Sequence, residues 1–294
     1  MFYRRKIILA LLQTFGGEVS KTSLQKLLFL FTQRQSKPEY DFVPYKYGCY
    51  SFSASADLSA MVKHGQLSED QTNYSKVDMN DYAKMLNEGD KKILVGVRNS
   101  YASLSASSLM KLTYLNYKYY AINSVKAFDV LSPEQYADVV AARPIKNHTT
   151  LYTIGYEGIS LEEYLNRLIR NDVKVLIDVR NNPISMKYGF SKKQLKEFVE
   201  GLGIEYLHIP EVGIQSDQRK ELLDQEDYDR LFDVYKNVNL KNTKNYQQII
   251  LDILKSKNRI ALTCFEANIC QCHRKHLAEA IANIPEWEYE LKHI

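Results

Sequence analysis

The segment ALTCFEANICQCHRKHLAEAI, near the end of the 294-residue chain, concentrates side chains that could do chemistry. It holds three of the four cysteines, two of the six histidines and an arginine. Such residues can form an anion pocket, activate a thiolate nucleophile or bind a metal ion. The plain alternative is a buried strand that runs into a helix.

An anion pocket is the first interpretation, because Cys272 and His273 lie where the last predicted helix begins. The unpaired N–H groups and the dipole of a helix N-terminus favour an anion. Arg180 and Arg274 could add bidentate contacts to a phosphate or a carboxylate. The same field would lower the pKa of Cys272 and favour its thiolate, so a nucleophilic cysteine is the second interpretation.

Zinc is the third interpretation. Cys264, Cys270, Cys272, His273 and His276 offer enough ligands for a tetrahedral site. Their spacing is not that of two separated C-x₂-C pairs, and Cys264 at the end of a buried strand is typical of a small apolar filler. We therefore predict no cofactor, and keep zinc on Cys264, Cys270, Cys272 and His276 as the less favoured alternative.

The elements that must position these residues are read from the second half of the chain. Strand and helix patterns alternate there, in the order LYTIG, SLEEYLNRLIRND, VKVLIDVR, SKKQLKEFVEGLG, IEYLHIP, RIALTCF and HRKHLAEAIAN. The strands are almost continuously apolar, as expected for strands that are covered on both faces. The pattern predicts an α/β domain over residues 150–294, with a mostly parallel sheet and flanking helices.

Polar residues follow three of these strands directly. In a parallel sheet the carboxyl ends of the strands meet at one edge, where ligands bind. The candidate catalytic residues are Asp178, Glu266 and Cys272. Asp178 or Glu266 would act as a general base or would position a nucleobase or ribose, and Cys272 would be an anion-site cysteine or a nucleophile. The candidate ligand- or phosphate-binding residues are Gly155, Tyr156, Glu157, Arg180, Ser185, Tyr188, His273 and Arg274.

Four ordered motifs, TIGYEG, LIDVRNNPIS, GIEYLHIPEVG and LTCFE…CHRKHLAE, span residues 151–294. Together they resemble the bacterial and archaeal family catalogued as domain of unknown function 488. The Cys-His-Arg triplet, here Cys272, His273 and Arg274, is the steady element of the family pattern, whereas a cysteine at position 270 is not. The resemblance implies a fold and a site, and the DNA-repair labels of many members imply a nucleic-acid or nucleotide ligand.

The first half of the chain reads mainly as helices. SKTSLQKLLFLFTQR has apolar residues at helical spacing, FVPYKYGCYSFS is extended and aromatic, and ASADLSAMVKHGQL is helical again. This order predicts a mainly α domain over residues 1–145, either winged-helix-like or a small bundle. Residues 1–150 carry a net charge of +6 and residues 151–294 a net charge of −2, so the first half favours phosphate or an acidic partner.

SLQKLLFLF, YKYGCYS and DLSAMVKHGQL resemble the Panacea (SocA-like) antitoxin domain family over residues 1–130. Cys49 stands where the family has proline. The resemblance implies a helical domain that binds other proteins, such as toxins or proteolytic adaptors, and that need not touch DNA. We expect residues 1–145 to bind either a protein partner, as this resemblance implies, or DNA, as a winged-helix-like fold and the positive charge would allow.

Composition limits the class of protein. Hydrophobic residues make up 45% of the chain, enough for a packed core, and no apolar run reaches the ~18 residues of a membrane span. We expect a cytoplasmic protein without membrane contact.

Three functions remain open at this point. The leading hypothesis is a nucleic-acid- or nucleotide-related protein with a phosphate pocket in its α/β domain, in phage defence or DNA maintenance. One alternative is a non-catalytic interaction module of a toxin–antitoxin or defence system, in which Asp178 and Arg180 form a structural ion pair. The other is cysteine-dependent sulfur or redox chemistry.

Overall fold

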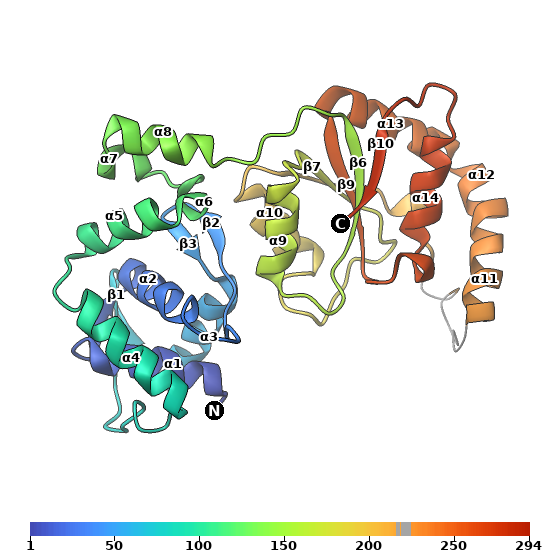
Figure 1. Ribbon diagram of the computed structural model, residues 1–294. Coiled ribbons are helices and arrows are strands. Elements are labelled where there is room, and N and C mark those ends of the chain that lie inside the picture. The colour runs from blue at the N-terminus through green and yellow to red at the C-terminus, as the bar shows by residue number, and fades with distance from the viewer. Residues whose placement is uncertain (216–217, 219–224) are drawn as a thin grey trace. The chain divides into compact units, whose positions relative to one another are not determined.

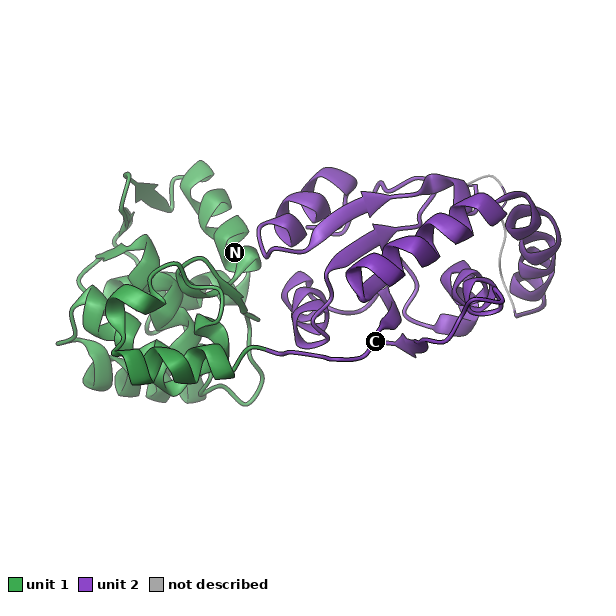
Figure 2. Ribbon diagram, turned by 90° about the horizontal axis from the view of Figure 1, so that it is seen from above, with its two compact units in different colours: residues 1–143 green, residues 144–294 purple. Residues whose placement is uncertain are grey.

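The structure is a computed structural model that describes residues 1–215, 218 and 225–294. The chain divides into two compact units, residues 1–143 (unit 1) and residues 144–294 (unit 2), which Figure 2 shows in different colours. Each is described by itself. Within these described ranges, no helix is both long enough and apolar enough to cross a membrane.

Unit 1 is rich in helices, as the sequence predicts. Its elements are α1 (Tyr3–Thr14), β1 (Glu18–Ser20), α2 (Lys21–Thr32), β2 (Val43–Tyr45), β3 (Gly48–Tyr50), α3 (Phe52–Lys63), β4 (Leu67–Glu69), β5 (Asn73–Lys76), α4 (Glu88–Tyr101), α5 (Ala106–Asn116), α6 (Lys118–Ala121), α7 (Ala127–Val130) and α8 (Pro133–Ala141). Strands β1, β5 and β4 form an antiparallel sheet in that order, and β2 pairs with β3 (Figure 1). From α1 to β5 the order is that of a winged helix, with the β2–β3 hairpin inserted between α2 and α3.

The second helix of unit 1 is fixed by its cap and by two polar side chains. The Ser20 side chain accepts a hydrogen bond from the backbone at the start of α2. The amide of Gln25 donates to the Ser51 carbonyl and accepts from the Ser51 N–H, at 3.3 and 3.0 Å. The buried Lys26 ammonium donates to the Tyr47 carbonyl at 2.6 Å. These contacts hold the hairpin against α2.

Unit 2 has the predicted α/β architecture. Its elements are β6 (Thr150–Gly155), α9 (Leu161–Arg170), β7 (Val175–Asp178), α10 (Lys192–Glu200), β8 (Glu205–His208), a 3₁₀ turn (Pro210–Val212), α11 (Gln225–Val234), a π-helical turn (Tyr235–Asn239), α12 (Leu240–Asn242), α13 (Lys244–Lys257), β9 (Arg259–Cys264), a second 3₁₀ turn (Ile269–Gln271), α14 (His273–Ala282) and β10 (Glu290–His293). The strands form one sheet in the order β10-β6-β9-β7-β8, and every pairing is parallel.

The strand order explains where the helices lie. The chain moves along the sheet in one direction from β6 through β7 to β8, and returns through β9 to β10. Because crossovers between parallel strands are right-handed, the two directions place their helices on opposite faces. Accordingly α9 and α10 cover one face and α13 and α14 the other (Figure 1).

The same order creates a crevice. β6 and β9 are neighbours, but the loop after β6 leads to α9 on one face and the loop after β9 leads to α14 on the other. Loops that part in this way leave a space beyond the carboxyl ends of the strands, which is where open α/β sheets bind ligands. The candidate site of unit 2 lies at this switch point.

Candidate functional site

The loops after β6, β7 and β9 meet beyond the carboxyl edge of the sheet. The backbone N–H of Tyr156 donates to the Phe265 carbonyl at 3.1 Å, and Arg180 Nη1 donates to the Tyr156 hydroxyl at 2.7 Å. Gly155 lies so close to the third loop that a Cβ there would be 2.0 Å from the Glu266 carbonyl oxygen. Residues far apart in the sequence therefore share one edge, as expected for a parallel sheet.

Asp178 and Arg180 form a buried ion pair. Arg180 Nε donates to Asp178 Oδ1 at 2.8 Å and its Nη2 donates to Oδ2 at 2.5 Å, while the Tyr206 hydroxyl donates to Oδ2 at 2.7 Å. Asp178 is fully buried and Arg180 is 6% exposed. Burial alone would lower the pKa of Arg180, but the hydrogen bonds and the charge of Asp178 outweigh burial and raise it.

This pair changes the roles expected for both residues. The Asp178 carboxylate accepts from Arg180 and Tyr206 on both oxygens, so it is poorly placed to take a proton from a ligand. The other donors of Arg180 bind the Tyr156 hydroxyl and the Phe190 carbonyl. The pair braces the loops, as the non-catalytic hypothesis expects, and among the two predicted general bases the geometry favours Glu266.

Arg274 is also engaged internally. It is 3% exposed, its Nη1 donates to the Glu266 carbonyl, and its Nη2 donates to the Ala267 carbonyl at 3.4 Å. Glu157 supports the same loop, because its carboxylate accepts from the Ala267 N–H at 2.9 Å. Both side chains thus fasten the loop after β9, and their expected contacts to a ligand stay a prediction.

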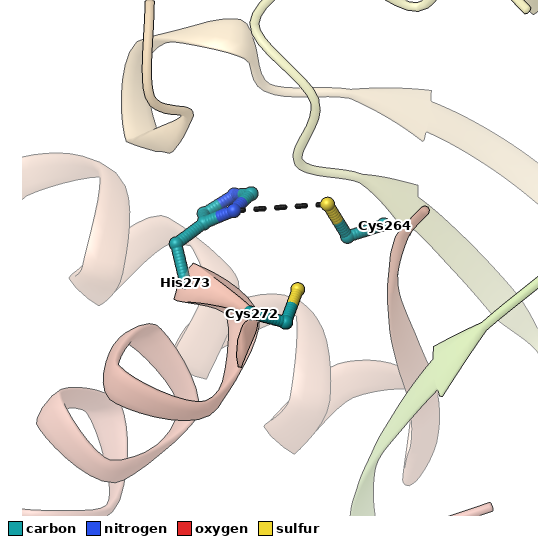
Figure 3. A group of neighbouring side chains, drawn as sticks. All are labelled: Cys264, Cys272 and His273. Atoms are coloured by element: carbon teal, nitrogen blue, oxygen red, sulfur yellow. Dashed lines mark hydrogen bonds between the residues drawn. The ribbon is translucent and has the colours of Figure 1, made fainter. Parts of the chain in front are cut away.

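Cys264, at the end of β9, is in contact with two of the other candidate residues. Its thiol donates to Glu266 Oε2 at 3.0 Å, and its Sγ is 3.7 Å from His273 Nδ1, as Figure 3 shows. The other ring nitrogen of His273, Nε2, lies 3.1 Å from the Val179 carbonyl oxygen. His273 was expected to bind a ligand directly, but its side chain is fully buried and contacts the carboxyl ends of β7 and β9.

The expected lowering of the Cys272 pKa is wrong. Cys272 is the N-cap of α14, as predicted, but its side chain is fully buried. Burial raises the pKa of the thiol well above its usual value, and Cys264 and Glu266 raise it further, while Arg274 offsets only part of this. The loss of hydration outweighs the field of the helix terminus.

Alkylation of the native, reduced protein tests this difference. We expect iodoacetamide near neutral pH to label Cys270, which is exposed, much faster than Cys272, which is fully buried. Time-resolved peptide mass spectrometry gives the two rates separately. If Cys272 is labelled as fast as Cys270, its side chain is not buried as described. The interpretation of Cys272 as a reactive thiolate would then be favoured again.

A cavity of about 320 Å³ opens beside Cys264. Its volume lies within the range of small-molecule sites. The lining residues are Tyr156, Arg180, Asn181, Asn182, Ile184, Ser185, Met186, Ile214, Cys264 and Phe265. Tyr156, Arg180 and Ser185 were predicted to bind a ligand, whereas Tyr188 is not in this lining and packs beside Phe198, with ring centroids 6.1 Å apart.

Several lining residues have no role in the sequence-based prediction of site residues. Ile214 and Phe265 read as ordinary apolar positions, and Asn181 and Asn182 as loop residues. Their position after a strand could have indicated them, because Asn181 and Asn182 follow β7 and Phe265 directly follows β9, at the edge of the sheet where ligands bind. Ile214 follows the first 3₁₀ turn, and no pattern in the sequence marks it.

Comparison with known families supports the family resemblance of the α/β unit. Residues 160–281 match the family described as domain of unknown function DUF488. The match lies within unit 2 and includes Asp178, Arg180, Cys264 and Cys272. No curated protein matches the chain.

Proposed function

We propose that unit 2 binds a nucleotide, free or exposed in a strand of nucleic acid, in the cavity beside Cys264. The observation that carries the proposal is the lining of the cavity. Amide, hydroxyl and guanidinium groups stand beside aromatic rings and exposed apolar side chains. A nucleotide has the matching parts, since its phosphate and base edges need hydrogen bonds and its base needs a face to stack on.

The apolar part of the lining is unusually open to solvent. Ile184 is 76% exposed, Phe265 is 42% exposed, and Met186 is fully exposed. Such side chains at the rim of a cavity offer contact area for a flat ring. The Tyr156 ring is buried; it stacks on Phe190 with centroids 4.2 Å apart and packs edge-on against Phe265.

Polar groups for a phosphate come from the loop after β7. Asn182 and Ser185 line the cavity. Lys187 lies in the same loop, and its ammonium donates to the Tyr156 carbonyl at 2.6 Å. An ammonium has three N–H donors, so this bond leaves capacity for a ligand oxygen. In this proposal Lys187 binds the phosphate, in place of Arg180 and Arg274, which the sequence predicted to do so.

Unit 1 adds little support for reading DNA bases. In a winged helix the groove would be entered by the counterpart of α3. Lys63 is the one basic residue of α3, and Asp57 is buried in ion pairs with Arg4 and Arg5. Base contacts in the major groove come mostly from arginine, lysine, asparagine and glutamine, which α3 otherwise lacks. The nucleic-acid proposal therefore rests on unit 2, and a protein partner for unit 1 stays a prediction.

Binding to the full-length protein tests the proposal. Nucleoside monophosphates and a short fluorescent single-stranded oligonucleotide are titrated against wild type and the variants Asn182→Ala and Lys187→Ala. Loss of a hydrogen bond to a charged group should weaken binding about tenfold or more. Lys193→Ala, which removes an equal charge from the exposed side of α10, is the matched control and should bind as wild type does.

Two results would end the proposal. One is that the wild type binds no nucleotide or oligonucleotide at millimolar concentration. The other is that Lys193→Ala weakens binding as much as Lys187→Ala, since binding would then reflect net charge and not the cavity. Inorganic phosphate and ribose 5-phosphate serve as competitors, and displacement by either as readily as by the nucleotide would exclude recognition of the base.

A further inference from the structure

Cys264, Cys272 and His273 bring their side chains together beneath the cavity (Figure 3). One ligand atom from each residue lies within 4.8 Å of the others, and all three residues are buried. We propose that these three side chains bind one zinc ion. The proposal does not depend on which ligand occupies the cavity.

The hydrogen bond of His273 prepares its ring for a metal. A carbonyl oxygen can only accept, so the Nε2 of His273 must carry the proton that bonds to the Val179 carbonyl at 3.1 Å. The Nδ1 lone pair then faces the Cys264 sulfur, 3.7 Å away. Metal-binding histidines are typically held in this way, with the second nitrogen donating to a carbonyl or carboxylate.

The spacing of the ligand atoms fits tetrahedral zinc. With Zn–S near 2.3 Å and Zn–N near 2.0–2.1 Å, two tetrahedral ligands stand about 3.6 Å apart. Cys264 Sγ and His273 Nδ1 are 3.7 Å apart. Two thiolates with one imidazole select zinc over calcium or magnesium, which take oxygen ligands.

The ligands come from positions that the fold holds firmly. Cys264 ends the central strand β9, and the 3₁₀ turn at Ile269–Gln271 brings the chain back so that Cys272 caps α14 and His273 begins it. Cys270 and His276 lie outside the cluster. Cys270 is exposed, and the His276 ring packs on Phe232, with ring centroids 4.7 Å apart. The ligand set thus differs from the one that the sequence suggested.

The described residues supply three ligands, which is the number typical of catalytic zinc sites. The remaining tetrahedral position would take a water molecule or a substrate atom. Cys264 lies in the wall of the cavity, so the zinc would border the space proposed for the nucleotide. Glu266 is not part of the ligand group, but its carboxylate is 3.0 Å from the Cys264 sulfur, so it would be near a zinc-bound water and could accept a proton from it.

Metal content of the full-length protein tests this site. Protein purified with reductant is stripped with a chelator, titrated with Zn²⁺ and measured by mass spectrometry of the metal. We expect about one zinc for each chain in wild type. Cys264→Ser, Cys272→Ser and His273→Ala should each lower zinc affinity by more than about 100-fold. Cys270→Ser, the matched control two residues from Cys272, should bind zinc as wild type does.

A second measurement needs no variant in the core. Co²⁺ added to the stripped wild type should give the visible bands of tetrahedral cobalt and a near-ultraviolet thiolate charge-transfer band, and Cys270→Ser should give the same spectrum. Failure of the reduced wild type to bind zinc or cobalt overturns the proposal, as does loss of binding in Cys270→Ser. A Cys264–Cys272 disulfide that forms in air while the reduced protein binds no metal would assign the cluster to redox chemistry instead.

Discussion

Replacing Asp178 by alanine is expected to lower the free energy of unfolding of unit 2 by about 3–5 kcal/mol. The change leaves the Arg180 guanidinium charged and 6% exposed without its carboxylate, and it removes the acceptor of the Tyr206 hydroxyl. A buried charge without a partner costs far more than an exposed ion pair contributes. The loss should appear as a lower urea midpoint.

Tryptophan fluorescence is suited to this measurement, because Trp287 is the one tryptophan of the chain and packs against the core of unit 2. Glu205→Gln is the control, since it breaks an exposed ion pair with Lys257 and should cost no more than about 1 kcal/mol.

The double variant Asp178→Ala with Arg180→Met separates the cost of an unpaired buried charge from the cost of lost side-chain packing. It leaves no buried charge, so it should recover more than half of the loss. An Asp178→Ala protein as stable as the control would show that the pair does not brace the loops. Failure of the double variant to recover stability would mean that the hydrogen bonds of Arg180 to Tyr156 and Phe190 carry the effect.

Replacing Gly155 by alanine is expected to have a comparable effect and also to disable the site. The new Cβ would lie 2.0 Å from the Glu266 carbonyl oxygen and 2.8 Å from its carbonyl carbon, so backbone must move. The Phe265 carbonyl accepts from the N–H groups of Tyr156 and Glu157, at 3.1 and 2.9 Å, and these bonds would be strained. We expect a loss of about 3 kcal/mol in unfolding free energy.

The same displacement should weaken nucleotide and zinc binding together by more than about tenfold, because Glu266 lies in the loop that moves and Cys264 directly precedes this loop. Gly158→Ala is the matched control in the neighbouring loop. Gly158 has φ +76° but open space around its Cβ position, so alanine costs about 1–2 kcal/mol of backbone strain without a clash. Equal binding losses in both variants would show that general destabilisation is responsible, and unchanged binding in Gly155→Ala would exclude a site at this loop.

The sequence alone determined the secondary structure and the fold class of unit 2. Apolar runs such as VKVLIDVR and RIALTCF, and helical spacing between them, are properties of neighbouring residues, so they can be read without a structure. The prediction that Cys272 and His273 begin a helix is confirmed for the same reason. The insertion of β9 between β6 and β7 is a pairing of distant segments, and no local pattern in the sequence specifies it.

Only the tertiary structure decided what each polar side chain contacts. Arg180 could meet a phosphate or a carboxylate, and burial beside Asp178 selected the carboxylate. His273 and His276 belong to one helix, but successive residues of a helix point in different directions, so His273 faces Cys264 and His276 faces Phe232. The chain's order fixes where a residue stands along its own element, whereas the chemistry of its side chain depends on the water it loses and the neighbours it gains when distant elements pack together.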